Sequence, residues 1–347
     1  MSHSRYFACG SNFIVCIDQL GIVRTLGDSH EGMYGSKYRS TCFSLKEIKN
    51  IPRMESVSCG DKFSVLLDDN GDIWSFGINF QGNLGIGNYY SQTIPQKIPS
   101  FSKIVSISCG RFHTLCIDEY SSVWGFGRND SGQLGLGHCR DVGTPQNIPL
   151  VNDFTIEQVS CGSSHSVIRD EKGEVYCTGL LVAGSTDLQM SFVPIEGLDN
   201  IASISCGYHH TLLLTLDGRV FGYGSNREYQ LSPVDLSSQL VRLQTGMDNY
   251  IVDPIEIEGL PEIEMIEAGS DRSLFVDIER RLWILGTLPD HKPYMTNIKH
   301  VHRVAISCDI IIIKDGTGGV YANRGLATGE SNPSTKDIVY APDLGPC

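Results

Sequence analysis

The chain has 347 residues and a formal net charge of −13, with 41% hydrophobic and 19% charged residues. This composition is ordinary for a protein that buries a core. It lacks the Lys/Arg-rich stripe that neutralises phosphates, which argues against direct nucleic-acid binding. Its longest purely aliphatic run, Ile310 to Ile313, is far too short to cross a bilayer, so we expect no membrane span.

The start of the chain and its cysteines indicate the compartment. Met1 to Gly10 lacks the charged segment and apolar stretch of a secretory signal. The twelve cysteines show no Cys-x-x-Cys pairing. We therefore expect free thiols in a reducing compartment, cytoplasmic or nuclear, and a protein that is not secreted.

A tandem repeat is the main signal in the chain. A Cys-Gly pair, or a pair with one substitution, occurs seven times with spacings of 50, 50, 52, 45, 62 and 40 residues. Six of the copies have a second Gly 17 residues later, preceded by an apolar-aromatic strand. The copies are Cys9-Gly10, Cys59-Gly60, Cys109-Gly110, Cys161-Gly162, Cys206-Gly207, Ala268-Gly269 and Cys308-Asp309.

The third repeat illustrates the strands expected in each unit. Apolar and alternating segments predict strands at Ile104 to Ser108, His113 to Asp118 and Val123 to Phe126. A Gly-rich loop follows, and Gln146 to Ile148 begins the outer strand. Four short strands in about 50 residues predict an all-β, seven-bladed β-propeller with four-stranded antiparallel blades.

Closure of the ring follows from the two ends of the chain. The chain starts at an inner-strand motif, Tyr6 to Cys9, and ends with Ile338 to Tyr340, which resembles an outer strand. Ring closure removes exposed end blades. We therefore predict that the N- and C-terminal strands pair within one blade, and that residues 1–347 form a single, monomeric domain.

Several segments resemble the regulator of chromosome condensation repeat, namely Ser108 to Leu115, Val123 to Gly127 and Gly132 to Gly137. The resemblance covers nearly the whole chain and implies a seven-bladed propeller. Founding members of that family resemble guanine-nucleotide exchange factors for a Ran-type small GTPase, and many relatives are adaptor or regulatory propellers. Fold alone does not settle which of these functions applies.

The two residues after each repeat Gly vary from blade to blade, as a binding surface on a constant scaffold does. In exchange-factor members, acidic and His residues in these turns face the GTPase, and Asp61, His209 and Asp271 match that usage by motif position. Aromatic and Arg side chains in the same turns are typical of binding hot spots. The candidate partner-binding residues are Asp61, Arg111, Phe112, Tyr208, His209 and Asp271.

No catalytic, cofactor or metal site is predicted. His113, His165 and His210 follow the repeat Gly by three residues, where other repeats carry Phe, so we expect structural histidines that bond neighbouring backbone. The Cys-to-His spacing of four puts each pair in a different blade, which disfavours a tetrahedral zinc site. The Gly-rich loops lack the Gly-Lys-Ser/Thr of a phosphate-binding loop and fit glycines at positive φ.

Two hypotheses follow, one of exchange or regulation of a Ran-like GTPase and one of a non-catalytic adaptor. Exchange-factor relatives lengthen one loop into a wedge, but the corresponding interval here is five residues in four repeats, and the only large insertion is Arg227 to Asp253. The adaptor would dock a basic partner on the acidic stretch Asp248 to Glu279, which holds ten carboxylates and one base, Arg272. An inhibitor propeller that covers an enzyme's cleft is a third, weaker alternative.

Overall fold

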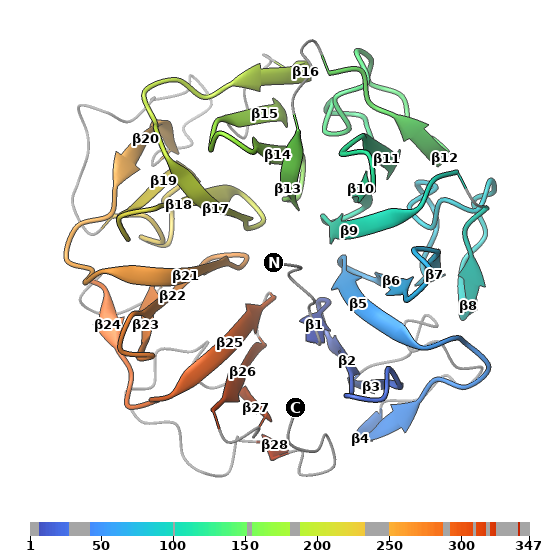
Figure 1. The fold of residues 1–347 in the computed structure, drawn as a ribbon, viewed down its shortest axis with the longest axis horizontal. Coiled ribbons are helices and arrows are strands. Elements are labelled where there is room, and N and C mark those ends of the chain that lie inside the picture. The colour runs from blue at the N-terminus through green and yellow to red at the C-terminus, as the bar shows by residue number, and fades with distance from the viewer. Residues whose placement is uncertain are drawn as a thin grey trace.

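The computed structural model describes residues 7–27, 42–99, 101–150, 155–180, 188–232, 250–286, 292–307, 310–316, 320–323 and 339–340. These residues form β-strands connected by turns and loops, and none of them belongs to a helix long and apolar enough to cross a membrane. The strands hydrogen-bond into seven sheets, each following the order of the chain. Figure 1 shows the sheets arranged radially, with the first strand of each nearest the centre.

The strands of the first four sheets are bounded as follows. The first sheet contains β1 (Phe7–Cys9), β2 (Phe13–Ile17), β3 (Val23–Gly27) and β4 (Cys42–Glu47). The second contains β5 (Met54–Cys59), β6 (Phe63–Asp68), β7 (Ile73–Gly77) and β8 (Gln92–Lys97). The third contains β9 (Ile104–Cys109), β10 (His113–Asp118), β11 (Val123–Gly127) and β12 (Val142–Asn147). The fourth contains β13 (Ile156–Cys161), β14 (His165–Asp170), β15 (Val175–Gly179) and β16 (Gln189–Pro194).

The remaining sheets are built in the same way. The fifth contains β17 (Ile201–Cys206), β18 (His210–Thr215), β19 (Val220–Ser225) and β20 (Tyr250–Glu256). The sixth contains β21 (Ile263–Ala268), β22 (Ser273–Asp277), β23 (Leu282–Leu285) and β24 (Tyr294–Met295). The seventh contains β25 (Val301–Ile306), β26 (Ile311–Asp315), β27 (Val320–Asn323) and β28 (Val339–Tyr340).

The sheets confirm the prediction of an all-β propeller with four-stranded antiparallel blades. The seventh sheet is partial, because residues 308–309, 317–319 and 324–338, including the motif Cys308-Asp309, lie outside the described residues. One strand boundary was wrong, since the outer strand of the third sheet runs from Val142 to Asn147 instead of beginning at Gln146. The central residues of the insertion after Arg227, residues 233–249, also lie outside the described residues.

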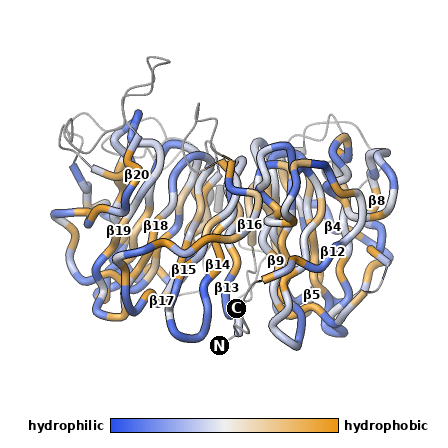
Figure 2. Tube along the Cα trace, turned by 90° about the horizontal axis from the view of Figure 1, so that it is seen from above, coloured by the Kyte–Doolittle hydropathy of each residue, from blue (hydrophilic) through white to orange (hydrophobic). Residues whose placement is uncertain are grey.

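The core lies between the sheets. Seven apolar clusters each join two successive sheets, and the second strand of a blade is buried along its whole length in β6, β10, β14 and β18. In the edge view of Figure 2, hydrophobic residues follow the strands and hydrophilic ones gather in the loops. Each blade therefore gains its stability from its two neighbours, as in other radial repeats.

The predicted pairing of terminal strands is wrong. β1 pairs with β2 inside the first sheet, and β28 pairs with β27 inside the seventh. Among the described strands, each repeat supplies all four strands of its own blade. The first and seventh sheets meet instead through packed side chains, with Phe7 and Cys9 against Ala305 and Ile312.

Candidate functional site

The turns that carry the predicted site residues lie at one end of the sheets, which we call the near face. Each turn joins an inner strand to the second strand of its blade. The loop after the third strand lies at the same end, because its first residue donates its N–H to the carbonyl of the turn. Ile78 donates to Lys62 at 2.9 Å, and Arg128 donates to Phe112 at 2.9 Å. The turns after the second strands lie at the opposite end, the far face.

Backbone hydrogen bonds between blades hold the near-face turns. The Asp61 N–H donates to the Arg111 carbonyl at 3.1 Å, and the Tyr208 N–H donates to the Gly269 carbonyl at 3.0 Å. A second set uses the Ser before each Cys, so that Ser108 Oγ accepts from the Cys161 N–H at 3.2 Å. Buried amides are thus satisfied by the next blade, and the turns become a rigid platform.

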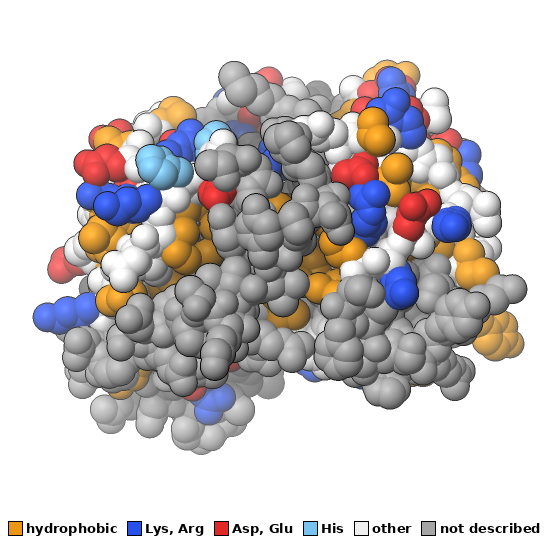
Figure 3. Space-filling view, turned by 90° about the horizontal axis from the view of Figure 1, so that it is seen from below, with side chains coloured by type: hydrophobic (Ala, Val, Ile, Leu, Met, Phe, Trp, Pro, Cys, Tyr) orange, Lys and Arg blue, Asp and Glu red, His pale blue; other side chains and the backbone are white. Residues whose placement is uncertain are grey.

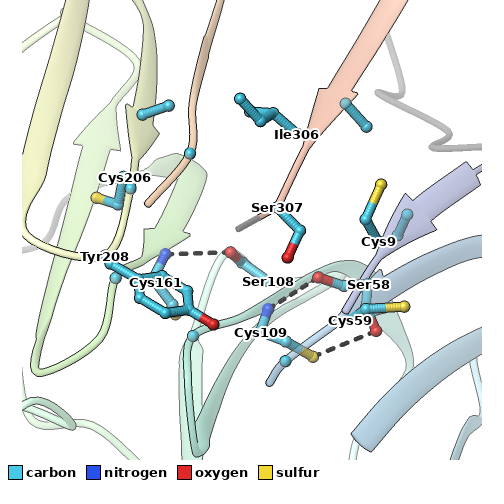
Figure 4. A pocket seen from close by; sticks show the side chains of 18 of the residues that line it. Cys9, Ser58, Cys59, Ser108, Cys109, Cys161, Cys206, Tyr208, Ile306 and Ser307 are labelled. Atoms are coloured by element: carbon cyan, nitrogen blue, oxygen red, sulfur yellow. Dashed lines mark hydrogen bonds between the residues drawn. The ribbon is translucent and has the colours of Figure 1, made fainter. Parts of the chain in front are cut away.

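A small central pocket of about 80 Å³ opens among these turns, lined by the inner-strand ends of all seven sheets. Its wall consists of the repeated Ser, Cys and Gly residues, and Figure 4 shows the Ser58–Cys109 and Ser108–Cys161 hydrogen bonds along it. Three of the predicted site residues, Asp61, Arg111 and Tyr208, also line this pocket. The opening is therefore polar and bounded by candidate binding residues.

Tyr208 connects two distant blades at this opening. Its hydroxyl donates to Asp61 Oδ1 at 3.2 Å, although the two residues are 147 positions apart. Arg111 Nε lies 3.7 Å from Asp61 Oδ2, and the guanidinium lies 5.1 Å from the Phe112 ring centroid and 5.8 Å from that of Tyr208. Both distances are within the range of cation–π contact. Four predicted residues from three blades thus form one cluster.

His209 and Asp271 extend the cluster toward solvent. The rings of Tyr208 and His209 meet edge-to-face at 6.3 Å between centroids. Desolvation beside the neighbouring turns lowers the pKa of His209, Asp271 opposes that effect, and Arg111 and Arg227 lower the pKa further. His209 is therefore a neutral, polar group at pH 7. The structure brings all six predicted residues to the near face, while their role in binding stays a prediction.

The histidines of the Gly-x-x-His motif are structural, but their partner differs from the prediction. His113 Nε2 lies 2.8 Å from Ser166 Oγ of the next blade. Because Ser166 Oγ donates to the Gln133 carbonyl at 2.7 Å, His113 is the donor to Ser166. The same arrangement joins His165 to Thr211 at 2.9 Å. In both cases the partner of Nε2 is a side-chain hydroxyl in the next blade, and not local backbone.

The repeated cysteines pack into the walls between blades. Nine cysteines are free among those whose side chains the structure describes. Burial raises the pKa of Cys177 and Cys206 to about 12 and raises that of Cys161 further, so these thiols stay protonated and are poor nucleophiles. Among the residues that the structure describes, no three His, Cys, Asp or Glu side chains are placed to hold a metal ion.

Sequence reasoning missed an aromatic group on the near face. In the loop between β7 and β8, Phe80 is 71% exposed, Tyr89 51% and Tyr90 78%. Exposed aromatic side chains grouped on one loop are typical of protein interaction sites. The signal was present as three aromatic residues within eleven positions of a Gly-rich loop. The corresponding loop of the third repeat carries Asp130 and Arg140 in place of Phe80 and Tyr90.

Comparison with known families identifies the repeat. The model described as the regulator of chromosome condensation (RCC1) repeat matches residues 70–117 and 121–168. A second model with the same description matches residues 55–83, 104–133 and 201–230. These matches fall in the second to fifth sheets, where the Gly spacing is most regular.

Curated relatives match parts of the chain. Protein pim1 of Schizosaccharomyces pombe is 26% identical over 216 residues, which is 54% of this chain and 39% of pim1. The mitochondrial RCC1 domain-containing protein RUG3 of Arabidopsis thaliana is 31% identical over 169 residues, 46% of this chain and 35% of RUG3. The probable E3 ubiquitin-protein ligase HERC6 of Homo sapiens is 34% identical over 105 residues, 26% of this chain and 10% of HERC6. The chain thus spans well under half of these relatives.

Solved structures share the fold. Prp20p from Saccharomyces cerevisiae, reported with its binding properties to Gsp1p and histones, superposes with a TM-score of 0.75 at 20% identity. The match covers 87% of this chain and 80% of Prp20p. Human WBSCR16 superposes with a TM-score of 0.75 at 19% identity, covering 89% of this chain and 86% of WBSCR16. At these identities the likeness shows the fold alone.

Proposed function

Because the chain belongs to the regulator of chromosome condensation (RCC1) repeat family, we propose that it is a protein-binding propeller that promotes or senses the nucleotide state of a Ran-like small GTPase. The observation that carries this proposal is the near-face cluster. In it the Tyr208 hydroxyl donates to Asp61, and the Arg111 guanidinium lies within cation–π distance of the Phe112 and Tyr208 rings. Tyr and Arg anchors at the centre of a surface are the common form of a binding hot spot.

The six residues divide into positioning and contacting groups. Asp61 has a side chain only 12% exposed and is engaged by Tyr208 and Arg111, so it holds those two side chains in place. The Arg111 side chain is 40% exposed and offers its guanidinium to a partner carboxylate. His209 and Asp271 are exposed, and with Phe112 they complete the contact surface. The exposed aromatic residues of the β7–β8 loop extend it toward the rim.

Exchange would be conformational, with no side chain of the propeller forming a bond to nucleotide. If the near face binds the nucleotide-free GTPase more tightly than the nucleotide-bound form, linkage requires that the GTPase bind nucleotide more weakly in the complex by the same factor. The preformed turns favour this mode, because little conformational entropy is lost when a rigid surface binds.

The test is nucleotide release from a panel of Ran-, Rab- and Rho-type GTPases loaded with a fluorescent guanine nucleotide. We expect the protein to accelerate release from at least one of them, and Asp61→Ala with His209→Ala to abolish the acceleration. The matched control, Asp69→Ala with His302→Ala, removes one Asp and one His at the far face and should keep full activity. Acceleration of no GTPase refutes exchange, and activity retained by the near-face variant refutes the site.

The adaptor alternative uses the acidic stretch Asp248 to Glu279, whose described part is spread over several elements. Arg219 lies 3.5 Å from Glu256, and Arg280 lies 2.8 Å from Glu264. In the edge view of Figure 3, acidic and basic side chains are interspersed over the described surface. These ion pairs reduce the negative electrostatic potential of the acidic stretch, so the adaptor hypothesis is the weaker one. Partner binding that does not depend on salt concentration would contradict it.

We also propose that residues 1–347 form one domain with seven complete blades, working as a monomer in a reducing cytoplasmic or nuclear compartment. The seven sheets and the apolar cluster between the first and last of them support the ring. The free described cysteines fit the compartment. A solution mass well above 38.1 kDa would contradict the monomer.

A further inference from the structure

A second concave surface lies on the far face, between the second, third and fourth sheets. It is a groove of about 580 Å³, which is within the range of roughly 300–1,000 Å³ typical of binding pockets. The starts of the inner strands β5, β9 and β13 and the turn after β10 form its walls. It is separate from the near-face cluster, because the two lie at opposite ends of the same strands.

The groove exposes an apolar residue at a strand position that is mostly polar in the other blades. Val105 lies in the groove and is 50% exposed. The corresponding positions of the other described inner strands carry Glu55, Glu157, Ala202, Glu264 and His302. In the adjoining turn, the Tyr120 side chain is 79% exposed. At this strand position the third blade therefore exposes an apolar side chain, whereas the other described blades carry mostly polar residues there.

The rim of the groove is negatively charged. Its lining contains four carboxylates and one guanidinium, Arg169. Arg169 pairs with Glu157 at 2.8 Å, and Lys103 lies 3.9 Å from Glu119 outside the lining. Glu55 makes no ion pair with a described residue. Asp118 is held by Trp124 and by Ser102, and its pKa is lowered by the hydrogen bonds it accepts even though burial raises it, so it stays ionised.

We propose that this groove docks a basic segment of a partner protein, in which a Lys or Arg reaches Glu55 and Glu157 and an adjacent apolar side chain covers Val105. Charge complementarity selects this occupant, since an acidic segment would meet net repulsion from the lining. The surface is independent of the near-face proposal and allows the protein to hold two partners at once.

The test is fluorescence anisotropy with the full chain and a labelled probe peptide, Gly-Ser-Arg-Leu-Arg-Ser-Gly. A second peptide with Glu in place of both Arg residues is the charge control. We expect the basic peptide to bind, more weakly as salt rises, and the acidic one not to bind. Glu55→Gln with Glu157→Gln should weaken binding at least fivefold, and Val105→Lys should abolish it by placing a cation in the groove.

The matched control is Glu264→Gln with Glu279→Gln, which removes the same charge from the far face of the sixth sheet. It should change the affinity by less than twofold, and the near-face variant Asp61→Ala with His209→Ala should bind normally. Thermal unfolding checks that each variant is folded. The proposal is overturned if the basic peptide does not bind, if the acidic peptide binds equally, or if both Glu→Gln pairs lose affinity alike.

Discussion

Three buried histidines should make the ring sensitive to mild acid. Burial lowers the pKa of His113 to about 3, that of His165 to about 4 and that of His210 to about 3. His113 and His210 donate Nε2–H to a serine hydroxyl of the next blade, whose own proton goes to a loop carbonyl. His165 Nε2 lies 2.9 Å from Thr211 Oγ1, and Nδ1 of His113 and His210 has no hydrogen-bond partner. The neutral form is therefore the one that fits.

The direction in which stability changes with pH follows from the lowered pKa values of the three histidines. The unfolded chain binds protons at these residues near pH 6.5, and the folded chain does not until the pH is far lower. Their contribution to stability is thus complete above about pH 6.5 and is lost as the pH falls toward the folded values of about 4 to 3. At about 1.4 kcal/mol per pH unit below 6.5, each His lowers the unfolding free energy by roughly 2 kcal/mol at pH 5.

The three sites together amount to about 6 kcal/mol, a large part of the 5–15 kcal/mol that stabilises most proteins. Urea unfolding followed by Trp fluorescence at about pH 7.5 and pH 5 measures the loss. The carboxylates with lowered pKa, such as Asp18 and Asp277, lose their contribution only as the pH falls further. The chosen window therefore isolates the histidines with a lowered pKa, which include His209 as well as the three buried ones.

The decisive variant replaces all three histidines by Phe, which stands at the same position in the first two repeats as Phe13 and Phe63. Both of those rings are fully buried and pack in apolar clusters with residues of the next blade. Phe carries no ionisable group. We expect the triple variant to lose most of the difference in unfolding free energy between the two pH values. An unchanged pH dependence in that variant would refute the reasoning.

Two further predictions concern packing between and within blades. Asp170 Oδ2 is buried without a partner, whereas Trp124 donates to the matching Asp118 at 2.9 Å. Tyr176→Trp should exchange the hydrogen bond from Tyr176 to the exposed Glu174 for one to the buried Asp170 oxygen, and should raise the unfolding free energy by about 1 kcal/mol. A lower urea midpoint would contradict this. Gly110→Ala would place Cβ 2.3 Å from the Gly162 carbonyl oxygen and should cost at least about 2 kcal/mol. Gly137→Ala is the control, because Gly137 has a φ of +77° but no atom lies within 4 Å of the added Cβ. It should lower the unfolding free energy by about 1 kcal/mol, measured by calorimetry. Equal losses in the two variants would show that close approach of the backbone is not the cause.

The aromatic residues of the β7–β8 loop show what sequence reasoning overlooked. Phe80 and Tyr90 are ordinary core residues by type, and nothing in their own repeat requires them to be exposed. They lie in a loop whose first residue, Ile78, donates its N–H to the Lys62 carbonyl at the near face. Only the tertiary structure shows that these side chains are exposed beside the turns that carry the candidate binding residues.

The sequence by itself determined the repeat, the strands of each blade and the turns in which the candidate residues lie. Those features depend on contacts within about 50 residues, which every copy of the motif specifies again. The tertiary structure decided how the ring closes, that the histidines bond the next blade, and that Tyr208 reaches Asp61 across 147 residues. These contacts join different repeats, and the ring geometry that places them depends on the packing of whole sheets against one another. No single motif records that packing.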